Sequence, residues 1–104
     1  MKRSITTQDF KKILFNSKSL LVRDLLFYYE ENNLGISFIV SKKLGIAVLR
    51  NQFKRRCRML FLHNNNIHQK TLQIIVRPQK KLNNNYSWDE LTSTFNEFYS
   101  KLEQ

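Results

Sequence analysis

The spacing of apolar residues along the chain predicts both helices and strands. Apolar residues at every third or fourth position are typical of a helix that packs on a core, whereas strict alternation is typical of a half-buried strand. The pattern predicts, in order, a short helix around residues 6–14, strands over 20–29 and 35–41, a helix over 47–63, a strand over 71–77 and a helix over 87–102. The order α-β-β-α-β-α predicts an α+β fold, a two-layer sandwich of helices on a sheet.

Polar residues separate the predicted elements. Thr6 with Asp9, and again Ser87 with Glu90, have the spacing of a capping box at the start of a helix. The polar stretches that we interpret as loops, because asparagine favours turns, lie at residues 30–33, 64–66 and 83–85.

Length and composition restrict the class of protein. The chain has 104 residues, of which 41% are hydrophobic, with only 2 glycines and 1 proline, so we expect a single folded domain over residues 1–104. No apolar run approaches the roughly 20 residues that span a bilayer, and no export signal follows the basic start of the chain. The only cysteine, Cys57, excludes an internal disulfide. We therefore expect a cytoplasmic protein with no membrane partner.

The charge of the chain is strongly basic and unevenly placed. It has 18 basic and 8 acidic residues, a net charge of +10. No acidic residue lies between Asn32 and Trp88, so the basic residues of that window have no neighbouring acid in the sequence. This distribution favours a polyanion, and above all a nucleic acid, as the partner.

The helix predicted over residues 47–63 has one apolar side and one basic side. On a helical wheel the apolar arc of about 120° holds Leu49, Phe53, Cys57, Leu60 and Phe61. The neighbouring arc of about 140°, here called the basic ridge, holds Arg50, Asn51, Lys54, Arg55 and Arg58. Like charges four residues apart repel by a few tenths of a kcal/mol per pair. A bound polyanion removes that repulsion, which favours a role of the ridge in binding one. The simpler alternative is that the ridge is a cationic face in contact with solvent alone.

Other chemistry-bearing residues indicate structural roles. Cys57 lies on the apolar arc, so we expect a buried side chain and not a nucleophile. His63 and His68 have no converging carboxylates and are interpreted as surface residues next to a loop, not as metal ligands. A protein nuclease would need carboxylates around a metal within the basic region, and that region has none. None of these residues is therefore expected to be catalytic.

Residues 41–58 carry a resemblance to a known family. Their sequence, SKKLGIAVLRNQFKRRCR, resembles the signature S-K-K-x-G-x-A-V-x-R-N-x-x-K-R-x-x-R of the bacterial ribonuclease P protein component. The order of the other predicted elements is similar to that family over nearly the whole chain. At two of the variable positions of this signature the chain departs from what is common in the family. The family often has R-N-R, and here the third residue of that motif is Gln52; the family's G-N-A-V has Ile46 in place of asparagine.

The resemblance implies a protein cofactor of a ribozyme, ribonuclease P, an endoribonuclease that removes the 5′ leader from precursor tRNA. The active site is then in the catalytic RNA, which binds most of the Mg²⁺. The residues that the resemblance assigns to the ribonuclease P RNA are Lys42, Lys43, Arg50, Asn51, Lys54, Arg55 and Arg58.

The resemblance also implies a cleft that holds the single-stranded leader of the precursor tRNA. Its lining is expected from Phe10, Leu14 and Tyr28, with Leu14 where the family often has an aromatic residue. Either Leu14 or the neighbouring Phe15 faces this cleft. Unpaired bases stack on aromatic rings without demanding a sequence, although aromatic residues on such elements are more often core.

Two other functions share the basic composition. A general RNA-binding or ribosomal protein would have a similar basic α+β fold but would not stimulate tRNA processing. A DNA-binding module that uses residues 47–63 as a recognition helix is disfavoured, because a strand and not a helix precedes it, so we expect no DNA partner.

Overall fold

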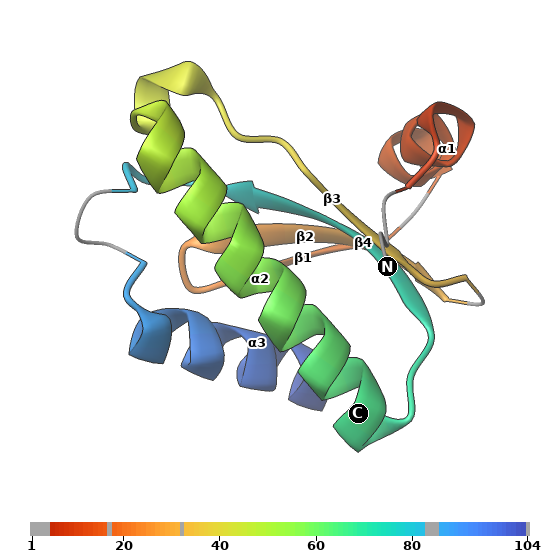
Figure 1. The fold of residues 1–104 in the computed structure, drawn as a ribbon. Coiled ribbons are helices and arrows are strands. Elements are labelled where there is room, and N and C mark those ends of the chain that lie inside the picture. The colour runs from red at the N-terminus through yellow and green to blue at the C-terminus, as the bar shows by residue number, and fades with distance from the viewer. Residues whose placement is uncertain (1–4, 17, 32, 83–85, 104) are drawn as a thin grey trace.

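The protein is described by a computed structural model, which describes residues 5–16, 18–31, 33–82 and 86–103. Figure 1 shows a sheet with helices packed on it. The elements are α1 (Thr7–Asn16), β1 (Lys18–Val22), β2 (Leu25–Glu31), β3 (Gly35–Phe38), the short 3₁₀ helix η1 (Lys42–Leu44), α2 (Ala47–His68), β4 (Leu72–Pro78) and α3 (Trp88–Leu102). The predicted α+β fold is confirmed, with the order α-β-β-β-α-β-α. None of the helices in the described residues is long and apolar enough to cross a membrane.

The four strands form one sheet in the order β1-β2-β4-β3. The β1/β2 and β2/β4 pairs are antiparallel, and the β3/β4 pair is parallel. Because parallel neighbours need a crossover, the chain leaves β3 through η1 and α2 before it returns as β4. The basic helix α2 contacts β3, the edge strand of the sheet, through Phe53 and Arg58, which lie against Phe38.

The single strand predicted over residues 20–29 is wrong, because the chain turns inside it. β1 and β2 form a hairpin in which Val22 pairs with Leu25, and Arg23 at the turn has a left-handed backbone with φ of 52°. The glycine or asparagine that usually marks such a turn is absent, so the apolar run hides it. The guanidinium of Arg23 lies 3.5 Å from a carboxylate oxygen of Glu90 and 3.6 Å from one of Glu97. These long-range ion pairs fasten the turn to α3.

The loop predicted over residues 64–66 is also wrong, because α2 continues to His68. Two of the asparagines are buried and bonded: the Asn64 amide donates to the Leu60 carbonyl at 2.8 Å, and the Asn65 side-chain oxygen accepts from the Tyr99 hydroxyl. These contacts outweigh the preference of asparagine for turns. The loop predicted over residues 83–85 lies outside the described residues.

The main core lies between one face of the sheet and the helices α2 and α3. Phe27 of β2 stacks on Phe98 of α3 with ring centroids 4.1 Å apart, and Phe95 meets the Phe27 ring edge-on at 5.3 Å. The predicted apolar arc of α2 is confirmed: Phe53, Cys57, Leu60 and Phe61 are buried, and Leu49 is half-buried against the same core.

Helix α1 packs on the opposite face of the sheet from α2 and α3 (Figure 1). Ile13 of α1 and Ile75 of β4 are both fully buried and lie outside the main core cluster. The Gln73 amide donates to the Asp9 carboxylate at 3.1 Å, because alternate residues of β4 point to this face. The two-layer sandwich therefore has an additional helix on its other side.

Candidate nucleic-acid interface

The start of the basic surface is organised by η1. Ser41 caps this short helix, since its hydroxyl oxygen accepts a hydrogen bond from the Lys43 N–H at 3.2 Å, and both Lys42 and Lys43 are exposed. One turn into α2, the Arg50 Nε donates to the Gly45 carbonyl at 3.2 Å. This hydrogen bond links the first ridge arginine to Gly45, which directly follows η1.

The basic ridge follows the flank of α2 that lies beside β3. Its inner members Arg50 and Lys54 are half-buried, and the others are exposed. The guanidinium of Arg58 lies over the ring of Phe38, 5.3 Å from its centroid, which is the geometry of a cation–π contact. The structure therefore holds the far end of the ridge against the edge strand of the sheet.

The cations of this surface have no carboxylate partner in the part of the chain that the structure describes. Among the described residues, carboxylates pair with other basic residues, such as Arg23 and Lys80, and with none of the ridge cations or of Lys42 and Lys43. A row of unpaired cations on a rigid helix attracts phosphates, which release counterions when they bind. The structure thus places the five predicted ridge residues along one side of α2, with Lys42 and Lys43 exposed on η1 before it.

The residues predicted to form the leader cleft lie on the α1 side of the sheet. Phe10 and Leu14 are one turn apart on α1, and both are half-buried. Tyr28 of β2 is half-buried and pairs in register with Ile75, so its side chain lies on the same face of the sheet as α1. Phe15 is 83% exposed, so Leu14 is the member of this pair that faces the sheet.

Two other predicted roles have clear outcomes. Cys57 is buried in the core, and burial raises the pKa of its thiol well above the ordinary value, so the thiol stays protonated. His68 is not a surface residue beside a loop: its Nδ1 lies 2.6 Å from a Glu103 carboxylate oxygen, and its ring stacks on Tyr99. His63 is exposed, as predicted.

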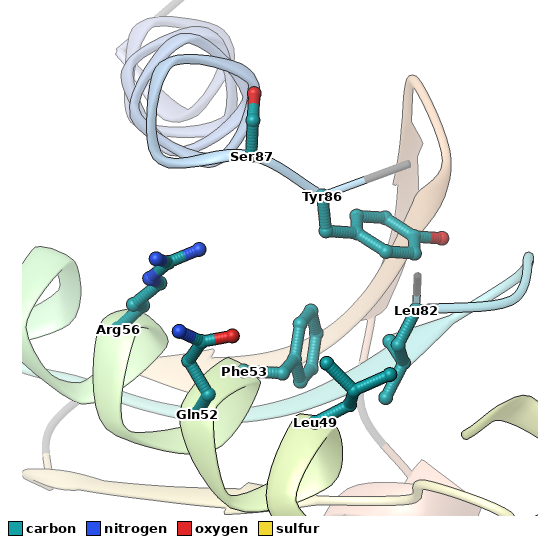
Figure 2. Close-up of a pocket in the computed structure, with 7 residues that line it drawn as sticks. All are labelled: Leu49, Gln52, Phe53, Arg56, Leu82, Tyr86 and Ser87. Carbon is teal, nitrogen blue, oxygen red and sulfur yellow. The ribbon is translucent and has the colours of Figure 1, made fainter. Parts of the chain in front are cut away.

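Sequence reasoning missed two hollows on the other flank of α2. The first, here called the Gln52 hollow, has a volume of about 160 Å³ and is lined by Gln52, Phe53, Arg56, Leu82, Tyr86 and Ser87 (Figure 2). The second, here called the lysine hollow, has a volume of about 410 Å³ and includes Lys42, Lys43 and Lys81. Leu49 lines both hollows. The signal in the sequence for the Gln52 hollow was the position of Gln52 and Arg56 on the helical wheel, at the border of the apolar arc.

An α+β sheet that carries an acid-free basic helix is typical of a nucleic-acid-binding protein. Residues 2–103 match a family model described as Ribonuclease P. The chain is 40% identical over 86 residues to the ribonuclease P protein component of Macrococcus caseolyticus, covering 75% of this chain and 73% of that protein. The chain therefore belongs to the ribonuclease P protein family, which places it in ribonuclease P and in tRNA processing.

Two further comparisons agree with this family. The ribonuclease P protein component of Staphylococcus epidermidis is 43% identical over 83 residues, covering 72% of this chain and 70% of that protein. The solved structure of the ribonuclease P protein from Thermotoga maritima has a TM-score of 0.81, with 100% of both chains covered and 24% identity. The structural likeness supports the fold, and the sequence similarity supports the family.

Proposed function

We propose that this chain is the protein cofactor of ribonuclease P, which binds the catalytic RNA and the 5′ leader of precursor tRNA so that the RNA removes the leader. The observation that carries the proposal is the row of cations on η1 and α2 that have no carboxylate partner among the described residues. Membership of the ribonuclease P protein family supports an RNA partner for this surface.

The catalytic RNA is the proposed partner of the basic surface. Its lysines and arginines bind phosphates, and Asn51, exposed in the middle of the ridge, has an amide that donates to phosphate or sugar oxygens. Because the ridge lies on a helix fixed by its core residues, the cations keep their spacing without RNA. The residues in this role are Lys42, Lys43, Arg50, Asn51, Lys54, Arg55 and Arg58.

The leader of the precursor tRNA is the proposed ligand of the α1 side of the sheet. Phe10 and Tyr28 are half-buried, so each is held in place by packing while part of its ring stays accessible. Unpaired bases stack on such rings whatever their sequence, which suits leaders of many sequences. Leu14 adds apolar contact without the stacking that an aromatic residue would supply.

Hydrolysis itself is assigned to the RNA subunit, with the cytoplasm as the place of the reaction. When bound to that RNA, Mg²⁺ supplies charge stabilisation and activates water. Within the described part of the chain, no three His, Cys, Asp or Glu side chains come together as a metal site. The protein's own residues bind and orient the two RNAs, and we propose no catalytic residue among them.

Cleavage of a 5′-extended precursor tRNA by a bacterial ribonuclease P RNA at limiting Mg²⁺ tests this proposal. We expect stimulation by the wild-type protein and its loss in the Arg55→Glu, Arg58→Glu variant. The matched control is Lys18→Glu, Lys101→Glu, which changes the net charge equally on exposed residues outside the ridge. RNA binding by the wild-type protein without stimulation would contradict the proposal and indicate a general RNA-binding protein.

A further inference from the structure

Gln73 is a buried polar residue in an otherwise apolar stretch of β4. All five residues from Leu72 to Val76 are buried, and Gln73, which is 6% exposed, is the only one of them with a polar side chain. β4 lies between β2 and β3 in the sheet, so its backbone is held on both sides. Burial of an amide is unfavourable unless the amide has a hydrogen-bond partner.

The partner of Gln73 is a carboxylate on α1, the helix that packs on the opposite face of the sheet from α2 and α3 (Figure 1). The Gln73 Nε2 donates to the Asp9 Oδ2 at 3.1 Å. A hydrogen bond to a charged acceptor is stronger than one between neutral groups. It is also directional, whereas apolar burial is not, so it fixes the place of Asp9 over β4.

Apolar packing alone leaves the rotation of α1 about its own axis poorly defined. Of the α1 side chains that the structure describes, Ile13 alone is buried. The ion pair of Lys12 with Glu30, at 3.6 Å, adds little, because its lysine is 62% exposed. The hydrogen bond of Asp9 is therefore the second firm attachment of α1 to the sheet, and two attachments fix a rotation that one does not.

The rotation of α1 decides where the proposed leader-binding residues of this helix point. At about 100° per residue, Phe10 and Leu14 lie roughly 100–140° around the helix from Asp9. Ile13 lies between these two sides of the helix. A rotation that lifts Asp9 away from β4 therefore turns Phe10 and Leu14 toward the sheet, and this changes the part of each side chain that a leader can reach.

The strand register places the hydrogen bond next to the third leader-binding residue. Gln73 pairs with Glu30, and Ile75 pairs with Tyr28 two residues along the same strands. Residues two apart on a strand share one face of the sheet, so Tyr28 and Gln73 both lie on the α1 side. A change in the position of α1 at Gln73 therefore changes the space between Phe10 and Tyr28.

We propose that Gln73 is a positioning residue for the 5′ leader of precursor tRNA, because its hydrogen bond to Asp9 sets the orientation in which α1 presents its leader-binding residues. The inference rests on the proposed function, since it takes the α1 side of the sheet as the leader site. Gln73 is buried, so it acts through α1 and not by touching the leader.

Exchange of the donor and the acceptor tests the hydrogen bond itself. Gln73→Glu places two carboxylates against each other, which repel. The double variant Asp9→Asn, Gln73→Glu restores the hydrogen bond with its roles exchanged, because the asparagine amide donates to the glutamate carboxylate. The double variant also has the same net charge as the wild type. Gln73→Met removes the hydrogen bond without adding a charge.

Binding of precursor tRNA and of mature tRNA, each with the ribonuclease P RNA present, measures the effect. We expect Gln73→Glu and Gln73→Met to weaken precursor binding roughly three- to tenfold, up to the scale of one lost stacked base, and to leave mature tRNA binding unchanged. The double variant should recover most of the loss. Equal losses for the two tRNAs, or no recovery in the double variant, would overturn the inference.

Thr94→Val separates positioning from a general loss of stability. Thr94 is buried in α3, on the other side of the sheet from α1, and its hydroxyl donates to the Glu90 carbonyl at 2.7 Å. Urea unfolding compares the stability of this variant with that of Gln73→Met. We expect both variants to be less stable than the wild type and only Gln73→Met to lose preference for the precursor. The same loss of preference in Thr94→Val would overturn the inference.

The wild-type protein separates this inference from the proposed function. If the wild type prefers the precursor to mature tRNA and Gln73→Met keeps that preference in full, the positioning role is refuted and the leader site stands. If the wild type shows no preference for the precursor, the leader site is refuted, and the positioning role is refuted with it.

Discussion

The guanidinium of Arg58 lies 5.3 Å from the centroid of the Phe38 ring, so a ridge cation of α2 is positioned by the edge strand of the sheet. Phe38 in turn meets the buried Phe53 ring edge-on, with centroids 6.2 Å apart. A long arginine side chain loses rotamer freedom when it binds a phosphate. The aromatic ring restricts Arg58 before RNA binds, and this reduces that cost.

Replacing the Phe38 ring is expected to weaken RNA binding without removing a charge. In Phe38→Leu the cation–π contact, of about 0.5–1 kcal/mol, is lost, so we expect affinity for the catalytic RNA to fall two- to fivefold, to order of magnitude. Filter binding at constant salt measures the change, and circular dichroism checks the fold. The matched control is Phe38→Tyr, which keeps the ring. Equal affinities of the two variants would show that the ring does not position Arg58.

The salt dependence of RNA binding counts the phosphate contacts of the ridge. For Arg55→Gln we expect the slope of log K against log salt concentration to become shallower by about 0.7–0.9, because one fewer counterion is released. The measurement is a binding titration at several salt concentrations. Lys18→Gln, an exposed cation of β1 outside the ridge, serves as the control. A slope that is the same in wild type and in Arg55→Gln would place Arg55 outside the interface.

Local periodicity was sufficient to predict the buried and basic sides of α2. Phe53, Cys57 and Phe61 are buried because residues three or four apart share one side of any helix, whatever lies against it. The orientation of Tyr28 toward α1 is different: it depends on the register with β4, which the sequence pattern does not contain.

The features that sequence reasoning missed depend on contacts between distant residues. The turn at Arg23 is supported by Glu90 and Glu97, and the buried Asn65 by Tyr99. The Gln52 hollow forms because Leu82, Tyr86 and Ser87 lie near α2 in space. No local pattern reports such pairings, so the hairpin, the longer helix and the Gln52 hollow required the structure.

Removal of the Tyr28 ring is expected to affect leader binding selectively. In Tyr28→Ala the loss of one stacked base, worth about 1–3 kcal/mol, should weaken binding of a precursor tRNA with its leader roughly tenfold or more. Binding of mature tRNA, which has no leader, should not change. The comparison is made with the ribonuclease P RNA present, and Tyr28→Phe, which keeps the ring, is the control. Equal losses for precursor and mature tRNA would indicate a packing role for Tyr28.

The buried Tyr99 is expected to make the protein less stable at alkaline pH. Its hydroxyl donates to the Asn65 side-chain oxygen, and burial raises the pKa of Tyr99 well above the ordinary value of 10. Since the unfolded chain loses this proton near pH 10 and the folded chain loses it only at higher pH, the contribution of Tyr99 is complete below pH 10 and declines above it.

Tyr99→Phe separates this contribution from the other effects of alkaline pH on the protein. At neutral pH we expect the variant to be less stable than the wild type by about 1–3 kcal/mol, because the Asn65 oxygen loses its donor. Between pH 9 and pH 11 the wild type should lose more stability than the variant, so that the two converge. Urea unfolding followed by circular dichroism at both pH values measures the difference. A constant difference across this range would show that Tyr99 does not titrate differently in the folded and unfolded chains.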